Sequence, residues 1–243
     1  MKKYKIFLIL IALIGYLGGG CEKDITTEGR SRITHYVTFE LEDVNDYGET
    51  MVEVGSSYSD PGFTAMEGEE DVTSKVKVEG SVDPSTVGAY HITYSAVNSD
   101  GYSASTSRTV IVYDPDYPSY DLTGAWNAEV IRNPGLDTEG GPFNTTITIR
   151  TVTNGFYRIS DWLVGFYDQG YGYGSVYTGP GYFTINSSNE IGFVEGVVAP
   201  GAWGDPIDDV ISGTYDPSEG TIEQKVSWLG GYYIFHETLN KTQ

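Results

Sequence analysis

Residues that carry out catalytic chemistry are scarce in this chain of 243 residues, which has three histidines and one cysteine. His35 and His91 lie in the N-terminal half, and His236 falls within a strand pattern. The chain has no Gly-x-Ser-x-Gly motif and no phosphate-binding glycine loop followed by lysine. Neither a hydrolase nucleophile elbow nor a nucleotide-phosphate site is therefore indicated. We predict that the protein is not an enzyme, with no catalytic residues and no cofactor.

Basic residues are also few, with 14 lysines and arginines against 34 aspartates and glutamates and a net charge of −20. A surface this acidic repels nucleic acids and anionic lipid headgroups, which excludes both as partners. The same acidity favours solubility.

The chain lacks a pair of cysteines and a long apolar run. With Cys21 alone no intramolecular disulfide can form, so burial must hold the fold together even in an oxidising compartment. The apolar run at 6–17 (IFLILIALIGYL) is too short for a helix to cross a bilayer core of about 30 Å. A basic start at Lys2, Lys3 and Lys5 precedes it and three glycines follow. This order is typical of a secretory signal peptide.

The segment 18–21 (GGGC) resembles the lipobox of bacterial lipoproteins, in which the cysteine is acylated. Leu17 lies four places before Cys21 rather than three, a looser spacing similar to that of Bacteroidetes lipoproteins. The resemblance implies a lipoprotein signal peptide over 1–20 and a lipid on Cys21. The alternative is a plain signal peptide that leaves an incidental free cysteine.

Residues 21–32 are polar and without periodicity, so we predict a flexible tether there. The charged residues 22–24 (EKD) resemble the export signal that sends Bacteroidetes lipoproteins to the outer face of the outer membrane. The resemblance implies a lipid-anchored protein of the outer membrane that faces the cell exterior.

Short strand patterns separated by turn residues fill 33–114. Residues 88–97 (GAYHITYSAV) alternate with period two, with Tyr90, Ile92 and Tyr94 on one face. One apolar face at this period is typical of a half-buried antiparallel strand. Turn signals about every ten residues over this length favour a small β-sandwich.

Five motifs in this half of the chain resemble, in order, the bacterial surface Ig-like domain that also occurs in a pesticidal crystal protein. They are 54–65 (VGSSYSDPGFTA), 71–73 (DVT), 80–83 (GSVD), 88–94 (GAYHITY) and 98–101 (NSDG). The resemblance implies a spacer or presentation module without catalytic residues over 33–114.

Residues 115–121 (PDYPSYD) hold two prolines among acids and tyrosines, which predicts a short semi-rigid linker. The segment 122–243 then shows eight short strand patterns, which suit an antiparallel up-and-down barrel or a sandwich closed on itself. Its opening, 122–126 (LTGAW), resembles the start of lipocalin-like barrels, which implies that the indole of Trp126 plugs the barrel end. The predicted fold class is all-β, with an Ig-like sandwich followed by a lipocalin-like barrel.

The whole arrangement resembles Bacteroidetes surface lipoproteins of unknown function that are encoded near glycan-uptake systems. The motifs that resemble their C-terminal domain are 157–161 (YRISD), 165–167 (GFY) and 170–174 (GYGYG). This family brings no agreed chemistry with it, so a site must be inferred from the residues.

Aromatic residues provide the candidate ligand site. Trp126 and Trp228 fall in strand patterns and are predicted to be buried. Trp203 lies in a loop of glycine and proline, and Trp162 begins a glycine-spaced stretch with several tyrosines. Aromatic faces beside small residues suit stacking on the C–H faces of sugars. We predict that four residues contact a ligand: Trp162, Trp203, Tyr171 and Tyr173.

The aspartates of the same half are weaker candidates. A calcium site needs six or more oxygens in a defined loop, and no such spacing is present, so no metal ligands are predicted. A glycosidase needs two carboxylates at a fixed separation. With 34 aspartates and glutamates in the chain, some carboxylates are expected to lie close together by chance. The candidate aspartates are Asp161, Asp168, Asp205, Asp208 and Asp209.

The preferred interpretation is a cell-surface accessory protein whose C-terminal domain binds an extracellular carbohydrate without catalysis, with the Ig-like domain as a spacer. One alternative is a structural or adhesive accessory that binds a partner protein such as an outer-membrane transporter. A weaker alternative is a glycoside hydrolase that uses the C-terminal carboxylates.

Overall fold

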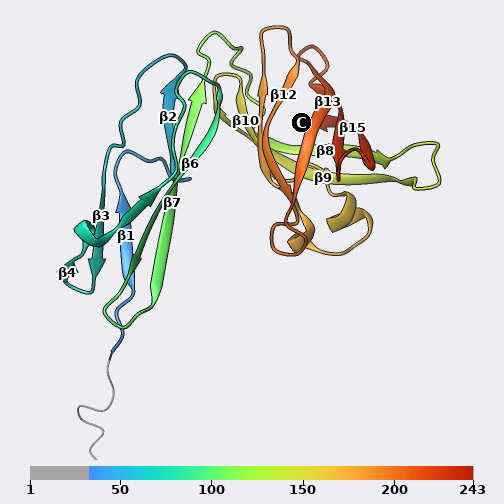
Figure 1. Cartoon of the computed structure of the whole chain (residues 1–243). Helices are drawn as coiled ribbons and strands as arrows, with labels where there is room; N and C mark the ends of the chain where they lie inside the picture. The colour runs from blue at the N-terminus through green and yellow to red at the C-terminus, as the bar shows by residue number, and fades with distance from the viewer. Residues whose placement is uncertain (1–32, 243) are drawn as a thin grey trace, which may run out of the picture. The chain divides into compact units, whose positions relative to one another are not determined.

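The computed structural model of the chain describes residues 33–242 (Figure 1). The predicted signal peptide 1–20, the lipid-attachment residue Cys21 and the tether 21–32 lie outside the described residues. Within the described part, no helix is long and apolar enough to cross a membrane.

Two sheets form the N-terminal domain (Figure 1). One has the order β1-β3-β4 and the other the order β2-β7-β6-β5, with β2 parallel to β7 and the other neighbours antiparallel. The predicted alternation is present, because Ile92, Tyr94 and Ala96 are buried while their neighbours face outward. The strands are β1 (Val37–Leu41), β2 (Glu49–Glu53), β3 (Phe63–Glu67), β4 (Glu70–Asp71), β5 (Lys77–Glu79), β6 (Gly88–Val97) and β7 (Ser103–Tyr113).

A buried arginine explains one of the Ig-like motifs. Arg108 is fully buried, and its guanidinium donates to the carbonyls of Glu42 and Gly62 at 2.6 and 2.8 Å. Its Nε donates to the hydroxyl of Tyr94, which donates in turn to Asp60 at 2.5 Å. The aspartate and glycine of the 54–65 motif are thus the partners of a charge that must be satisfied once it is buried.

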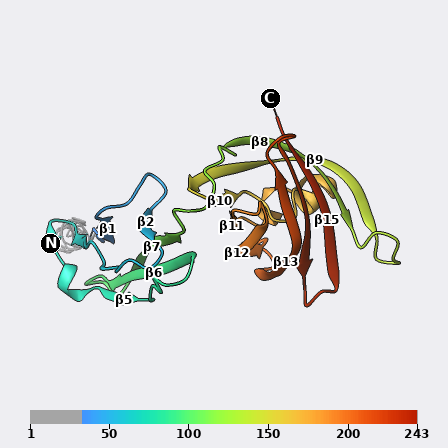
Figure 2. The same cartoon turned by 90° about the horizontal axis from the view of Figure 1, so that it is seen from above.

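Eight antiparallel strands close into an up-and-down barrel in the C-terminal domain (Figure 1 and Figure 2). Each strand pairs with its neighbours in sequence, and β8 closes the barrel by pairing with β15. The seam between β12 and β13 has two paired positions, Val197 with Pro206 and Val198 with Asp205, and one isolated bridge. The strands are β8 (Gly124–Arg132), β9 (Gly140–Thr153), β10 (Phe156–Ile159), β11 (Gly181–Ile185), β12 (Ile191–Val198), β13 (Asp205–Asp216), β14 (Thr221–Trp228) and β15 (Tyr233–Lys241).

The all-β prediction, with a sandwich followed by a barrel, is confirmed. Alternating inward residues of every barrel strand meet in one apolar core, which includes Trp126, Ile147 and Leu239. Trp126 is fully buried near the start of β8, and its Nε1 donates to the carbonyl of Leu122 at 2.9 Å. The same core takes Trp228, as its strand pattern predicts.

A buried ion pair joins residues of the two domains. Glu49 of β2 is 2% exposed and accepts hydrogen bonds from Arg150 of β9 at 2.5 and 3.1 Å. The hydroxyl of Tyr182 in β11 donates to the same carboxylate at 2.8 Å, and Asn45 donates at 3.0 Å. Burial opposes the charge of Glu49, but these hydrogen bonds outweigh it and lower the pKa of the carboxyl.

Candidate functional site

Antiparallel alternation brings four connections to the same end of the barrel. The connections 133–139, 160–180, 199–204 and 229–232 all lie where β8, β10, β12 and β14 finish and the next strands begin. We call this the aromatic end, because most of the exposed aromatic side chains of the C-terminal domain lie in these connections.

Tyr167 is the centre of the aromatic cluster. Its ring lies 4.9 Å from that of Trp203 and 5.7 Å from that of Trp228, both edge-on, and it stacks against Tyr171 and Tyr173. The side chain is almost fully buried. A buried ring thus supports three exposed ones, so the exposed rings have a fixed arrangement.

The loop that carries Trp203 is held by one carbonyl. The backbone N–H groups of Ala202, Trp203 and Gly204 all donate to the carbonyl of Ala199, at 2.8 to 3.0 Å. Trp203 stacks on Trp228 with ring centroids 5.7 Å apart and an interplanar angle of 29°. The indole of Trp203 is still 41% exposed, so part of the ring is available to a ligand.

Tyr171 and Tyr173 follow a π-helical turn, Phe166–Gly170. A Cβ at Gly170 would overlap the ring of Phe143, so only glycine lets the turn approach β9 this closely. Tyr171 and Tyr173 stack on each other at 5.6 Å and remain 41% and 51% exposed. The structure therefore brings Tyr171, Tyr173 and Trp203 together, as the predicted site requires.

Trp162 does not belong to this surface, and its prediction as a ligand-contacting residue is wrong. It is fully buried, and its Nε1 donates to the carbonyl of Glu195 at 2.8 Å. Gly181 and Gly196 make the room, since a Cβ at either position would overlap the indole. The two glycines were the sequence signal for burial, but they lie far from Trp162 in the chain.

Asp161 holds the connection 160–180 in place. Its buried carboxylate accepts backbone N–H groups of Leu163, Gly165 and Gly179 at 3.1, 2.7 and 2.8 Å. Burial raises the pKa of Asp161 to about 6, against the effect of the three N–H donors. Asp161 therefore fixes both ends of the segment that presents Tyr167, Tyr171 and Tyr173.

Polar groups surround the rings. Arg132 donates to the hydroxyl of Tyr167 at 3.1 Å, and its guanidinium lies 4.5 Å from the ring centroid of Tyr233. Burial raises the pKa of Tyr167, so its hydroxyl stays protonated at neutral pH. Among the described residues, the buried Nε1 of Trp228 has no hydrogen-bond partner.

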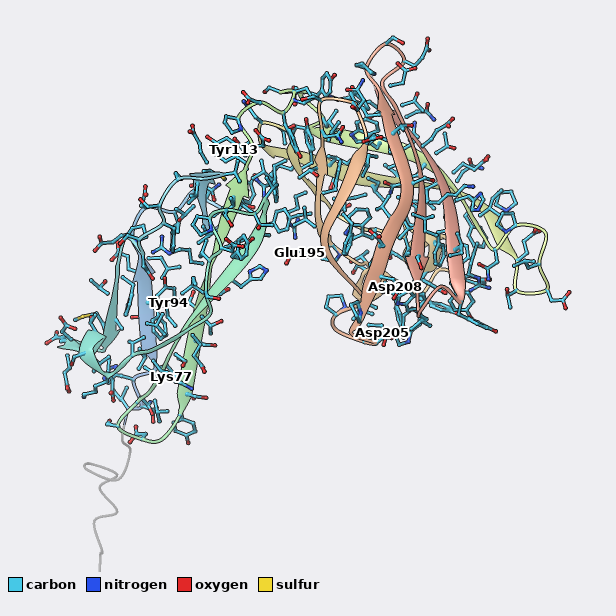
Figure 3. All side chains as sticks on the ribbon, turned by 45° about the horizontal axis from the view of Figure 1, so that its top comes forward. Lys77, Tyr94, Tyr113, Glu195, Asp205 and Asp208 are labelled. Carbon is cyan, nitrogen blue, oxygen red and sulfur yellow. The ribbon has the colours of Figure 1, made fainter. Side chains whose placement is uncertain are left out.

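Asp205 and Asp208 lie at the aromatic end, within the first four residues of β13 (Figure 3). Asp208 accepts the hydroxyl of Ser227 and the N–H of Gly231, both at 3.0 Å, so it fixes the 229–232 connection. Within 33–242, no group of three or more histidine, cysteine, aspartate or glutamate residues is placed to hold a metal ion.

Several residues of the site are not evident from the sequence alone. Arg132 stands in no motif, and the 165–167 motif does not single out Tyr167 as the centre of the site. The roles of both depend on contacts between segments that are far apart in the chain. The ring centroids of Tyr232 and Tyr233 lie 4.7 Å apart, and the β14–β15 hairpin pairs Tyr233 with Trp228, so that their rings stack.

Comparison with known proteins supports the two-domain arrangement. A family model of a bacterial surface protein Ig-like domain matches residues 43–112, and a family model of a C-terminal domain matches residues 114–241. No curated protein matches the chain. The crystal structure of the lipoprotein BT2262 from Bacteroides thetaiotaomicron is 32% identical over 84% of this chain and 100% of that one, with a TM-score of 0.45. The C-terminal family model covers more than half of this chain, and the 32% identity extends over the whole of the relative. The chain therefore belongs to the family of this Bacteroides lipoprotein.

Proposed function

We propose that the protein is a lipid-anchored accessory of the outer cell surface that binds an extracellular carbohydrate at the aromatic end without catalysing a reaction. One observation carries the proposal: Trp203, Tyr171 and Tyr173 are exposed rings that buried rings hold in a fixed arrangement. Sugars present flat C–H faces that pack on such rings, and ring positions that are fixed beforehand reduce the entropy lost on binding.

The location of the protein is inferred from its family and its N-terminus. The Ig-like domain is of the type found in bacterial surface proteins, and the relative from Bacteroides thetaiotaomicron is a lipoprotein. The predicted signal peptide and Cys21 indicate the same location. In this proposal the lipid on Cys21 holds the protein on the outer membrane, and the Ig-like domain acts as a spacer for the barrel.

A non-catalytic role fits the placement of the acids. The carboxyl groups of Asp161 and Glu237 are buried within the barrel, so neither can reach a glycosidic bond at the surface. Asp208 is engaged by Ser227 and Gly231.

The test is affinity electrophoresis of the chain in gels that contain plant, host-mucin or microbial polysaccharides. We expect at least one glycan to retard the wild type, and the Trp203→Ala variant to bind it about tenfold more weakly, because a ring at the centre of a site contributes on the order of 1.4 kcal/mol or more. Tyr36→Ala is the control, since Tyr36 is an exposed tyrosine of the Ig-like domain. Equal retardation of Trp203→Ala and the wild type by every glycan that binds would contradict the proposal.

A protein partner is the second candidate. Leu229, Val176 and Tyr232 are also exposed at the aromatic end, which extends its apolar surface beyond the rings that a sugar would use. If no polysaccharide retards the wild type, crosslinking on intact cells should capture an outer-membrane protein such as a transporter, and the Leu229→Asp variant should lose it.

A further inference from the structure

The outer face of the barrel next to the aromatic end carries polar side chains in register. Asn240 of β15 pairs with Asn127 of β8, which pairs with Thr146 of β9. One step along the strands, Thr238 pairs with Glu129, which pairs with Asn144. Since the side chains at these positions share one face of the sheet, they form two parallel rows across three strands.

These two rows line a hollow of about 610 Å³. We call it the amide hollow, after its asparagine and glutamine side chains. Glu129 is the only charged residue among those that line it, and no basic or aromatic side chain is among them. The lining residues are Asn127, Ala128, Glu129, Asn144, Thr145, Thr146, Gln169, Thr238 and Asn240.

The asparagine side chains of the amide hollow have N–H groups that could donate hydrogen bonds to a ligand. Asn127 and Asn240 each accept one hydroxyl through Oδ1, from Thr146 at 3.4 Å and from Thr221 at 3.1 Å. Among residues 33–242, no hydrogen bond engages the Nδ2 groups of Asn127, Asn144 or Asn240. An amide offers both a donor and an acceptor, which matches a hydroxyl group.

The amide hollow adjoins the aromatic end at Gln169. The amide of Gln169 accepts the N–H of Thr146 at 2.9 Å and donates to its carbonyl at 2.8 Å, so it caps the edge of β9 where no strand pairs. Gln169 belongs to the π-helical turn that Tyr171 follows, and the ring centroid of Tyr171 lies 5.2 Å from that of Phe143 on β9.

We infer that the amide hollow and the aromatic end form one continuous binding surface for an internal stretch of a long, uncharged polysaccharide. This inference rests on the proposed function and specifies its ligand. The rings of the aromatic end pack on sugar faces, and the amides and hydroxyls of the hollow bind the hydroxyl groups of the next residues of the chain.

The charge and the dimensions of the hollow select this ligand class. An acidic glycan would meet Glu129 and a protein of net charge −20, with no basic side chain in the hollow to compensate. Neighbouring strands lie about 4.8 Å apart, so three strands present polar groups over about 10 Å. Several sugar units are therefore needed to occupy both the hollow and the rings, which predicts that affinity increases with chain length.

The experiment uses the full chain after signal removal, with four probes in affinity electrophoresis. Galactomannan and xyloglucan are the uncharged polymers, and polygalacturonate and chondroitin sulfate are the anionic ones. The test variant is Asn127→Ala/Asn144→Ala. The matched control is Thr148→Ala, because Thr148 faces outward on β9 but lies outside the hollow. Trp203→Ala reports separately on the aromatic end.

We expect an uncharged polymer to retard the wild type and the anionic ones to have no effect. The double variant should bind about fivefold or more weakly, the loss expected from one or two hydrogen bonds, and Thr148→Ala should bind as the wild type does. Oligosaccharides of two or three units should bind at least tenfold more weakly than the polymer.

The outcomes separate this inference from the proposed function. If Trp203→Ala abolishes binding and the double variant binds as the wild type does, the aromatic end is a glycan site and the inference about the hollow is overturned. Preferred binding of an anionic polymer, or disaccharide affinity equal to that of the polymer, also overturns it. If no polysaccharide retards the wild type, both proposals fail together.

Discussion

Glu237 is a carboxyl group inside the barrel. It lies on β15 between Phe235 and Leu239, whose side chains belong to the barrel core, and it is 3% exposed. One carboxyl oxygen accepts the amide of Gln224 at 2.7 Å, and the other has no hydrogen-bond partner among the described residues. Burial raises the pKa of Glu237 well above its usual value, and the charge of Asp161 adds to the effect.

We predict that Glu237→Gln is more stable than the wild type at pH 8, and that this difference in stability is smaller at pH 5. The unfolded chain loses this proton near its ordinary pKa, whereas the folded protein keeps it to higher pH, so the free energy of unfolding falls as pH rises between the two values. The glutamine of the variant does not titrate, so the free energy of unfolding of the variant should fall between pH 5 and pH 8 by at least about 1 kcal/mol less than that of the wild type.

Urea unfolding at pH 5 and pH 8 measures the effect. Glu223→Gln is the matched control, because Glu223 faces outward on the neighbouring strand β14. The same pH dependence in Glu237→Gln and in the wild type would show that Glu237 is ionised in the folded protein at both pH values.

Trp162 and Trp203 show what single residues do and do not reveal. Trp203 lies in a loop of glycine and proline and Trp162 begins a glycine-spaced stretch of tyrosines, which predicts ligand contact for both, but Trp203 is exposed and Trp162 is buried. Glycine next to a tryptophan can mean an open loop or room for the ring. Only the pairing of β11 and β12 shows that Gly181 and Gly196 provide room for Trp162.

Among the elements, the connection 160–180 is the one that the site depends on most. We predict that Asp161→Asn loosens it and lowers the stability of the barrel by about 2 kcal/mol. An amide turns its own N–H groups toward the backbone donors of Leu163, Gly165 and Gly179, so at least one of them loses its acceptor while buried.

Near-UV circular dichroism, which reports on the packing of aromatic rings, and urea unfolding check this prediction. The control is Asp168→Asn in the same connection, because Asp168 is partly exposed and its side chain makes no hydrogen bond within 33–242. Wild-type spectra and stability in Asp161→Asn would show that the connection does not need the carboxylate.

Strands were easier to predict than connections. The barrel strands follow from short strand patterns that are local in sequence, with clear period-two alternation in β14 and in part of β9, although β13 begins at Asp205, earlier than its pattern indicates. The π-helical turn Phe166–Gly170 leaves no comparable pattern. Its conformation depends on Asp161 and on the close approach of Gly170 to Phe143, which are contacts across the fold.

At the scale of the whole molecule, the contact between Glu49 and Arg150 links β2 of the Ig-like domain to β9 of the barrel. Arg150 also lies over the ring of Tyr47, with its guanidinium carbon 3.9 Å from the centroid. Beside this pair, Ile111 of β7 shares a buried apolar cluster with Phe156 and Tyr182. A buried charge and a shared apolar cluster together predict that the two domains unfold as one cooperative unit.

Arg150→Ala tests this coupling. The substitution leaves the buried carboxylate of Glu49 with Tyr182 and Asn45 as its hydrogen-bond partners and with no opposite charge. Removing one partner of a buried ion pair destabilises a protein by about 3 kcal/mol or more. We expect calorimetry at pH 7 to show one transition for the wild type and, for Arg150→Ala, an earlier onset that resolves into two. Lys225→Ala, which removes a solvent-exposed charge from β14, should retain the wild-type profile.

The pH dependence of the same pair provides an independent check. The pKa of Glu49 is lowered in the folded protein, so its contribution to stability is complete above its ordinary pKa and is lost as the pH falls through the lowered value. The difference between wild type and Arg150→Ala should therefore shrink in acid, where protonation removes the charge that Arg150 compensates. A difference that is unchanged at pH 3, or two transitions in the wild type at pH 7, would mean that the ion pair does not couple the domains.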